Sequence, residues 1–384
     1  MSRLAERSVA SRGSGVSGAP PTKTLRAVII VGCVLGVIAT ACQWIAGIDD
    51  RTVYDGGSIT NDAGMNPCLG ANLPPNPGTA GTGTLTFTAA LSQIMLGQTD
   101  GGPYYGFNLD RTCTCFLDAS DSCTRPNGEP RACDDPNGID NYARRIFETI
   151  NALPTGEDGG FITEAKLNVA LQTGLSGALI QVSQYNGLPN DGEVTVTVFG
   201  SVGYANYPTA PAFDGGDKWN IDPTSASLKY QTNNAYVANN TLVASLDFPI
   251  IIGSAVTQPV YIQLHSGLIV ANLETNDAGV VTKMTGQLGG RWSPQDFLPS
   301  LQVVPDPISP GSYLCGSDGT YQILKNIICT NLDVNEDPAN DGTGACNAVS
   351  MGLGFVALPA QVGATVTPPD AGYGCEAGLM ESCP

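Results

Sequence analysis

Residues 193–199 read Glu193-Val-Thr-Val-Thr-Val-Phe199, and this stretch decides the fold class. Branched apolar side chains alternate with threonine, which is the two-residue period of a strand with one buried face. Turn-forming pairs such as Asn186-Gly187 and Asn276-Asp277 separate similar stretches. These further strand patterns cover residues 167–171, 178–185, 242–246, 260–273 and 280–288. The middle of the chain is therefore predicted to be mainly β.

Short strands without helical periodicity between them are typical of antiparallel sheets. We expect an antiparallel β-sandwich of the jelly-roll-like kind, with a closed β-barrel as the alternative. Two short helices flank the strands and carry apolar residues at three- and four-residue spacing. The first covers residues 142–153, capped by Asp140 or Asn141, and the second follows a cap at Asp318. We expect both helices to cover one end of the sandwich.

The start of the chain has the composition of an export signal. Basic residues precede an apolar run at residues 27–38, and the run ends at Ala39-Thr-Ala-Cys42. The run is shorter than the ~20 residues that a membrane-spanning helix needs, so we favour a cleaved signal over a retained helix. The basic residues of this leader are Arg3, Arg7, Arg12, Lys23 and Arg26.

A cysteine directly after small residues resembles the lipobox of bacterial lipoprotein precursors. The resemblance covers about the first 45 residues, and Ala39 stands where lipoboxes usually have leucine. In that family the chain is cut before the cysteine and the thiol is acylated, which implies a lipid on Cys42. Gln43 stands where an aspartate would imply retention at the inner membrane. The resemblance therefore implies a lipid anchor in the cell envelope, at the outer membrane, with plain secretion as the alternative.

Three regions follow from this division of the chain. Residues 1–41 are the predicted signal peptide, and residues 42–84 are the lipidated cysteine with a flexible tether rich in Gly and Pro. Residues 85–384 are predicted to form a single β domain held together by disulfides. This body resembles, at the level of architecture, the uncharacterised extracellular lipoproteins built as disulfide-bonded β-sandwiches.

The charge of the chain excludes one class of partner. The net charge is −18, and it becomes −22 without the leader, because five of the 17 basic residues and one of the 35 acidic residues precede Cys42. Such a chain repels nucleic acid, so we expect no nucleic-acid partner. We expect the membrane to be contacted through the lipid anchor.

Ten cysteines follow Cys42, and an even number in an exported chain indicates disulfides. They form an early and a late group of five each, so complete internal pairing requires at least one bridge between the groups. Zinc binding by the early group is a weaker alternative, because zinc sites favour paired C-x2-C spacings. The ten are Cys68, Cys113, Cys115, Cys123, Cys133, Cys315, Cys329, Cys346, Cys375 and Cys383.

Two acidic loops offer oxygen ligands at alternate positions, as calcium prefers. The first contains Asp134, Asp135, Asn137 and Asp140, and the second covers residues 333–342. Neither has the spacing of an EF-hand. We expect ordinary turns and a helix cap at these loops, with calcium as the one cofactor that the sequence suggests.

Catalytic templates find little support in this chain. His265 is its one histidine, which excludes most histidine-based metal and nucleophile sites, and we expect it on an exposed strand face. A polysaccharide hydrolase that uses paired carboxylates is the alternative. Its candidates are Glu148, Glu157, Glu164, Glu193 and Glu274. No catalytic residue is assigned, and whether the chain is an enzyme stays open, with the balance against it.

Aromatic residues beside loops are the last functional indication. Flat rings of this kind stack on sugars or dock proteins. The candidates are Tyr104, Tyr105, Tyr204, Tyr207 and Trp219. The function that we expect is a tethered, non-enzymatic module that binds glycan or protein, with the hydrolase and a structural envelope protein as alternatives.

Overall fold

The computed structural model describes part of the unit Tyr54–Pro384, one of two units into which the chain divides. The leader, Cys42, Cys68, Glu157, Asp318 and the predicted tether up to residue 72 lie outside the described residues. The described residues are 73–78, 83–97, 103–115, 122–153, 162–227, 230–252, 260–304, 306, 308–309, 312–316, 319–367, 375 and 382–383.

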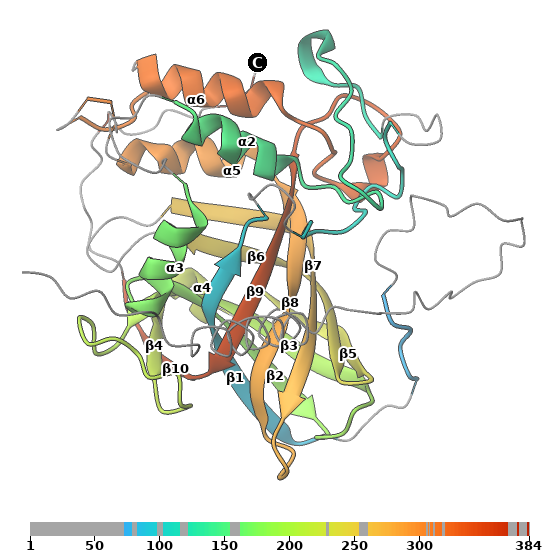
Figure 1. The fold of residues 1–384 in the computed structure, drawn as a ribbon, viewed down its shortest axis with the longest axis vertical. Coiled ribbons are helices and arrows are strands. Elements are labelled where there is room, and N and C mark those ends of the chain that lie inside the picture. Colours follow the sequence, from blue (N-terminus) through green and yellow to red (C-terminus); the bar gives the residue numbers. More distant parts are fainter. Residues whose placement is uncertain are drawn as a thin grey trace, which may run out of the picture. The chain divides into compact units, whose positions relative to one another are not determined.

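Eight antiparallel strands form a closed barrel (Figure 1). They follow one another around it in the order β3, β2, β1, β9, β8, β7, β6, β5, and β5 pairs back onto β3. Their bounds are β1 Leu85–Met95, β2 Gly177–Tyr185, β3 Asp191–Tyr204, β5 Gln231–Ala238, β6 Thr241–Ile252, β7 Val260–Thr275, β8 Val281–Trp292 and β9 Val349–Pro359.

The expected sandwich was wrong, and the alternative, a closed barrel, is confirmed. The length of β3 explains how the barrel closes. β3 has 14 residues, twice the length of the alternating stretch that begins at Glu193. Its first half pairs with β5, from Asp191 opposite Val237 to Thr197 opposite Gln231, which closes the cylinder. Alternating hydrophobicity is the same in a sandwich and in a barrel, because both bury one face of each strand. The sequence pattern therefore predicts the strands but not the closure.

The second half of β3 continues beyond the barrel into a small extension of the sheet. It pairs with β4 (Lys218–Ile221), and β4 pairs in parallel with β10 (Gln361–Thr365). Trp219 of β4 is fully buried there in a small apolar cluster with Leu179 and Phe199. Ala89 and Leu91 belong to the main core and Ala90 to this smaller cluster, as the two-residue period of a strand requires.

Helices α2 (Tyr142–Asn151), α5 (Pro294–Phe297) and α6 (Gly319–Thr330) lie across one end of the barrel (Figure 1). Their buried apolar residues are continuous with the barrel core. α2 matches the prediction, but its capping does not. The Asn141 side chain pairs instead with the backbone of Gly352, and the Asp140 carboxylate accepts from the N–H of Leu109.

Residues 167–171, which we predicted to be a strand, belong to helix α3 (Glu164–Gln172) instead. Thr163 caps this helix by accepting a hydrogen bond from the Lys166 N–H, and Glu164 lies in its first turn. Both features favour a helix start and outweigh a five-residue alternation of apolar residues. The remaining short elements are α4 Pro223–Ala226, η1 Pro126–Gly128, η2 Leu298–Val303 and η3 Pro338–Asn340.

Between the described residues, four disulfides join eight cysteines. Cys123–Cys346 links the early group to the late group, as parity requires. Cys113 is also disulfide-bonded. The other three bridges are Cys115–Cys133, Cys315–Cys375 and Cys329–Cys383. In the part of the chain that the structure describes, no helix is long and apolar enough to cross a membrane.

Candidate functional site

An apolar cavity lies between the helices and strand β7, and it encloses about 160 Å³. Among the described residues that line it, all are apolar except Thr163 and Lys166. The apolar ones are Phe147, Ile150, Ile162, Leu167, Ile262, Phe297, Leu301, Val304, Leu324 and Ile328.

Helical periodicity brings these side chains to the cavity. Phe147 and Ile150 are three residues apart on α2, and Leu324 and Ile328 are four residues apart on α6, so each pair lies on one helix face. Ile262 contributes from β7, where it is buried. The cavity is thus a gap between elements that otherwise share one core.

The size and the lining of the cavity determine what it can hold. Protein interiors leave few voids larger than a water molecule. An engineered apolar cavity of about 150 Å³ stays dry and binds benzene, which gives a measure of capacity. A space of about 160 Å³ therefore holds one aromatic ring or a short alkyl chain.

The two polar lining residues lie at the start of α3. The Thr163 hydroxyl is engaged as the helix cap. Lys166 follows one turn later and is exposed, although its side chain lines the cavity. Long lysine side chains cover apolar surface with the stem and keep the ammonium in water. Lys166 is thus the one ionisable side chain among the described residues that line the cavity.

A second site brings together four carboxyl groups near the start of α2. Asp134 and Asp140 hydrogen bond to each other, and Asp110 and Asp333 lie close enough to interact with both. The Asp140 carboxylate also accepts from the N–H of Asp110 at 3.2 Å. Asp333 accepts two hydrogen bonds from Ser350 of β9, through its N–H and its hydroxyl. Asp110 and Asp333 come from other segments of the chain than Asp134 and Asp140, and the fold brings the four carboxyl groups together at this point.

The acid cluster, which we define as Asp110, Asp134, Asp140 and Asp333, contains three carboxyl groups with raised pKa values. Burial raises the pKa of Asp134 to about 7, and the negative charge of Asp110 adds to the rise. Burial also raises the pKa of Asp333 to about 7, against the hydrogen bonds from Ser350. Burial and the charges of Asp110 and Asp134 raise the pKa of Asp140 well above its ordinary value. Shifts of this kind occur at functional sites and in structural networks alike.

Geometry favours a structural role for the acid cluster. The gap lined by Asp134, Asp140 and Asp333 has no room for a water-sized molecule. Asp135, the next residue of the predicted calcium loop, forms an ion pair with Arg144 at 2.8 Å, and Asn137 is exposed in a turn. Among the described residues, no group of three or more His, Cys, Asp or Glu side chains is arranged to hold a metal ion. Calcium binding at this loop stays the alternative to the ordinary turns that we expected.

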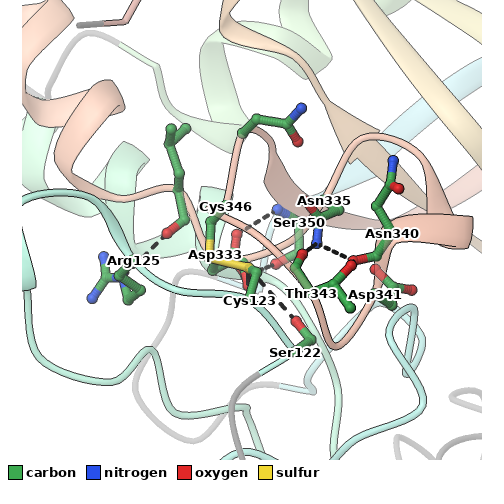
Figure 2. Close-up of a disulfide and its surroundings, with 12 residues drawn as sticks. Ser122, Cys123, Arg125, Asp333, Asn335, Asn340, Asp341, Thr343, Cys346 and Ser350 are labelled. Atoms are coloured by element: carbon green, nitrogen blue, oxygen red, sulfur yellow. Dashed lines mark hydrogen bonds between the residues drawn. A yellow bond between two sulfur atoms is a disulfide. The ribbon is translucent and has the colours of Figure 1, made fainter.

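Arg125 attaches this region to the end of α6, and the Cys123–Cys346 disulfide attaches it to the segment before β9 (Figure 2). The buried Arg125 guanidinium donates to the carbonyls of Thr330 and Leu332 at the C-terminal end of α6. A cation at this end of a helix interacts favourably with the helix dipole. Arg125 therefore holds the C-terminal end of α6, which carries two of the cavity side chains.

The five aromatic residues that we predicted to bind a ligand have different surroundings. Tyr104 and Tyr207 are exposed, and the Tyr104 ring lies beneath Arg144 at 5.4 Å. Trp219 is fully buried and Tyr204 packs against it, with ring centroids 5.9 Å apart. Tyr105 packs on Gly354 of β9. The structure does not bring the five together, and the Trp219 ring has no face available to a ligand.

His265 is more enclosed than the exposed position that we expected. Its side chain is 21 % exposed, and Nε2 lies 2.7 Å from a carboxylate oxygen of Asp296. This hydrogen bond raises the pKa of His265, and the charges of Glu336, Asp296 and Asp247 act in the same direction.

The candidate acids of a hydrolase have separate partners. Glu148 pairs with Arg144 and Glu274 with Lys283, while Glu164 accepts a hydrogen bond from the Leu96 N–H. Such pairs are typical of solvated faces.

Comparison with protein-family models, curated proteins and solved structures finds no match to this chain. The cavity and the acid cluster are therefore interpreted from their own geometry.

Proposed function

We propose that the protein is a non-enzymatic binding protein of the cell envelope that holds a small apolar molecule in the cavity between its helices and β7. The observation that carries the proposal is a cavity of about 160 Å³ whose described lining residues are almost all apolar. Ligand sites in proteins are concave and mostly apolar, with a few polar groups that orient the ligand. Thr163 and Lys166 are the polar groups in this site.

The proposed site lies at the helix-covered end of the barrel and not along its axis. Eight-stranded barrels are just wide enough to be filled by side chains or to hold one small ligand. In this barrel, inward-facing residues such as Leu91, Ile180 and Met284 belong to one continuous core. The space for a ligand is therefore where α2, α3 and α6 meet β7.

The proposed location comes from the leader. A lipid on Cys42 would anchor the body to the membrane, and Gln43 favours the outer membrane on the lipoprotein resemblance. The four disulfides support export, because such bridges form and persist in oxidising compartments.

Titration calorimetry with 1-octanol tests the proposed binding. We expect one molecule to bind per chain. Leu167→Trp places a larger side chain in the cavity wall and should weaken binding at least about tenfold. Val169→Trp is the matched control, because Val169 lies on the same helix and is 60 % exposed. Equal binding by both variants, or no binding of octanol to the unaltered protein, contradicts the proposal.

A further inference from the structure

We propose that the end of the barrel opposite the helices contacts a neutral lipid surface directly, with the side chains of Leu85, Leu188 and Val280 in the interface. This contact is additional to the lipid anchor on Cys42. It rests on the proposed location at the membrane and is independent of ligand binding in the cavity.

Three exposed apolar side chains meet at this end of the barrel, which we call the turn end (Figure 1). Leu85 begins β1, Leu188 lies in the β2–β3 turn and Val280 in the β7–β8 turn, and they are 51 %, 59 % and 57 % exposed. A Cβ on Gly187 would lie 2.9 Å from the Leu85 side chain, and one on Gly279 would lie 3.8 Å from the Gly187 carbonyl oxygen. The two turns and the start of β1 are therefore neighbours. Exposed apolar residues that gather in this way mark interaction sites, whereas scattered ones do not.

The backbone of both turns is already satisfied at the exposed apolar residues. The Leu188 N–H donates to the Asn186 side chain at 2.8 Å, and the Leu188 carbonyl accepts from the Tyr185 hydroxyl at 2.8 Å. The Val280 N–H donates to the Asn276 side chain at 3.0 Å, and its carbonyl accepts from the Asn276 N–H at 3.0 Å. A backbone polar group without a partner is costly in an apolar environment. Leu188 and Val280 can therefore leave water without leaving such a group unpaired.

The turn end carries little charge in a strongly acidic chain. The turns at residues 186–190, 239–240 and 276–280 contain one ionisable residue, Asp277, although the chain has 35 acidic and 17 basic residues. Most of the other turn residues are asparagine and glycine. An anionic surface would repel a chain of this net charge. The turn end therefore suits a lipid surface with zwitterionic head groups.

The tether that the sequence predicts joins the body at the same end. The Asn76 side chain donates to the carbonyl of Gly192, the second residue of β3, and the Tyr236 hydroxyl donates to the Pro74 carbonyl. About 30 residues separate Cys42 from this segment, and a Gly-rich chain of this length spans roughly 30 Å on average, whereas a body of about 300 residues is on the order of 50 Å across. The attachment point thus keeps the turn end nearer than the helices to an anchored Cys42. At such short range even a weak contact is populated.

Tryptophan fluorescence in vesicles tests the inference. The full chain is incorporated into phosphatidylcholine vesicles whose acyl chains carry bromine, which quenches tryptophan inside the lipid. The unaltered protein supplies the contribution of the native tryptophans, which is subtracted. We expect Leu188→Trp to lose roughly half of its added emission, because apolar side chains at such an interface lie about 5–10 Å deep. Val169→Trp on α3, where Val169 is 60 % exposed, is the matched control and should not be quenched.

A second substitution tests the apolar character of the contact. Val280→Asp, added to Leu188→Trp, should abolish the quenching, because a carboxylate is costly to bring into the lipid. Val169→Asp, added to the same variant, should leave the quenching unchanged. Quenching that survives in Val280→Asp contradicts insertion of the turn end.

The outcomes separate this inference from the other proposals. Equal quenching of Leu188→Trp and Val169→Trp, in protein that sediments with the vesicles, overturns the inference and leaves the anchor intact. Protein that does not sediment with the vesicles contradicts both. An added tryptophan that is protected from aqueous iodide but is not quenched by bromine lies under a protein surface, which also overturns the inference. Octanol binding should be unchanged in Leu188→Trp, since the turn end lies outside the cavity.

Discussion

Arg291 of β8 and Asp341 form a bidentate ion pair, with both N–O distances at 2.6 Å. The Arg291 side chain is 1 % exposed, and its guanidinium also donates to the carbonyls of Leu109 and Asn335. One buried side chain thus joins the barrel to two loops that are distant in sequence. These loops continue into the acid cluster through Asp110 and Asp333.

The first prediction concerns this ion pair. Arg291→Met should lower the free energy of unfolding by about 3–5 kcal/mol, because it removes one partner of a buried pair and leaves the Leu109 and Asn335 carbonyls without their donor. Lys283→Met on the same strand removes an exposed pair with Glu274 and should cost less than about 1 kcal/mol. Chemical denaturation of both variants measures the difference. Equal losses would show that Arg291 does not hold the loops in place.

The second prediction compares two disulfides. Cys123–Cys346 spans 223 residues and Cys115–Cys133 spans 18. On the chain-entropy account, removing the first with paired serine substitutions costs about 5 kcal/mol and removing the second about 3 kcal/mol. Urea denaturation of the two double variants checks this order. A larger loss from the short bridge contradicts the view that Cys123–Cys346 fixes the two cysteine groups together.

The third prediction is that the acid cluster destabilises the protein at alkaline pH. The folded-state pKa of Asp134 and of Asp333 is about 7, above the ordinary value of 3.8. A raised folded-state pKa gives stability that is complete below the unfolded-state pKa and is lost as the pH rises through the folded-state pKa. The Tm should therefore fall between pH 5 and pH 8.

Asp134→Asn tests the origin of this pH dependence. The amide stays neutral and keeps an oxygen for the Thr114 N–H, so the variant should lose less stability than the unaltered protein between pH 5 and pH 8. We expect the Tm change over this range to shrink by about 2–4 °C. His265→Gln is the comparison, because the raised pKa of His265 gives a fall in stability in the same direction. An unchanged slope in Asp134→Asn would place the titrating groups elsewhere.

The fourth prediction concerns the anchor. Cys42→Ser should leave the precursor uncut and without fatty acid, because serine lacks the thiol that is acylated on the lipoprotein resemblance. Metabolic labelling with a radioactive fatty acid measures this directly. Normal labelling of the serine variant would exclude Cys42 as the lipidated residue.

Several strands of the barrel could be predicted from the sequence. Strand β9 could not, and its residues show why. Its apolar residues Val349, Met351, Leu353 and Phe355 alternate regularly and all belong to the core. Ser350, Gly352 and Gly354 stand between them, and glycine is depleted in strands. In the structure, a Cβ on Gly354 would lie 2.4 Å from the Tyr105 ring. The glycines of β9 thus allow another segment to pack against the strand, which a single sequence does not reveal.

The cavity was only partly predictable. The apolar stripes of α2 and α6 follow from their spacing, and they include Phe147, Ile150 and Leu324. A gap between such stripes depends on how far apart the helices pack, which periodicity does not determine. Lys166 was missed because the segment after it alternates like a strand over five residues. The Thr163 cap and Glu164 in the first turn are the signals that could have identified α3 as a helix.

Two of the four residues of the acid cluster could be identified from the sequence. Asp134 and Asp140 lie in one loop of the sequence, and we considered this loop as a calcium site. Asp110 and Asp333 come from other segments, and the Arg291 contacts with Leu109 and Asn335 hold those segments in place. Long-range contacts of this kind leave no periodic signal in the chain.

A crystal structure of the protein with 8-bromo-1-octanol tests the central claim most directly, because the anomalous signal of bromine locates the end of the alkyl chain. We expect one strong bromine peak inside the cavity, among Phe147, Ile150, Leu324 and Ile328. The peak should be absent from crystals of Leu167→Trp and present in crystals of Val169→Trp. Bromine bound only outside this cavity, with the cavity empty, would contradict the claim that the protein binds an apolar molecule there.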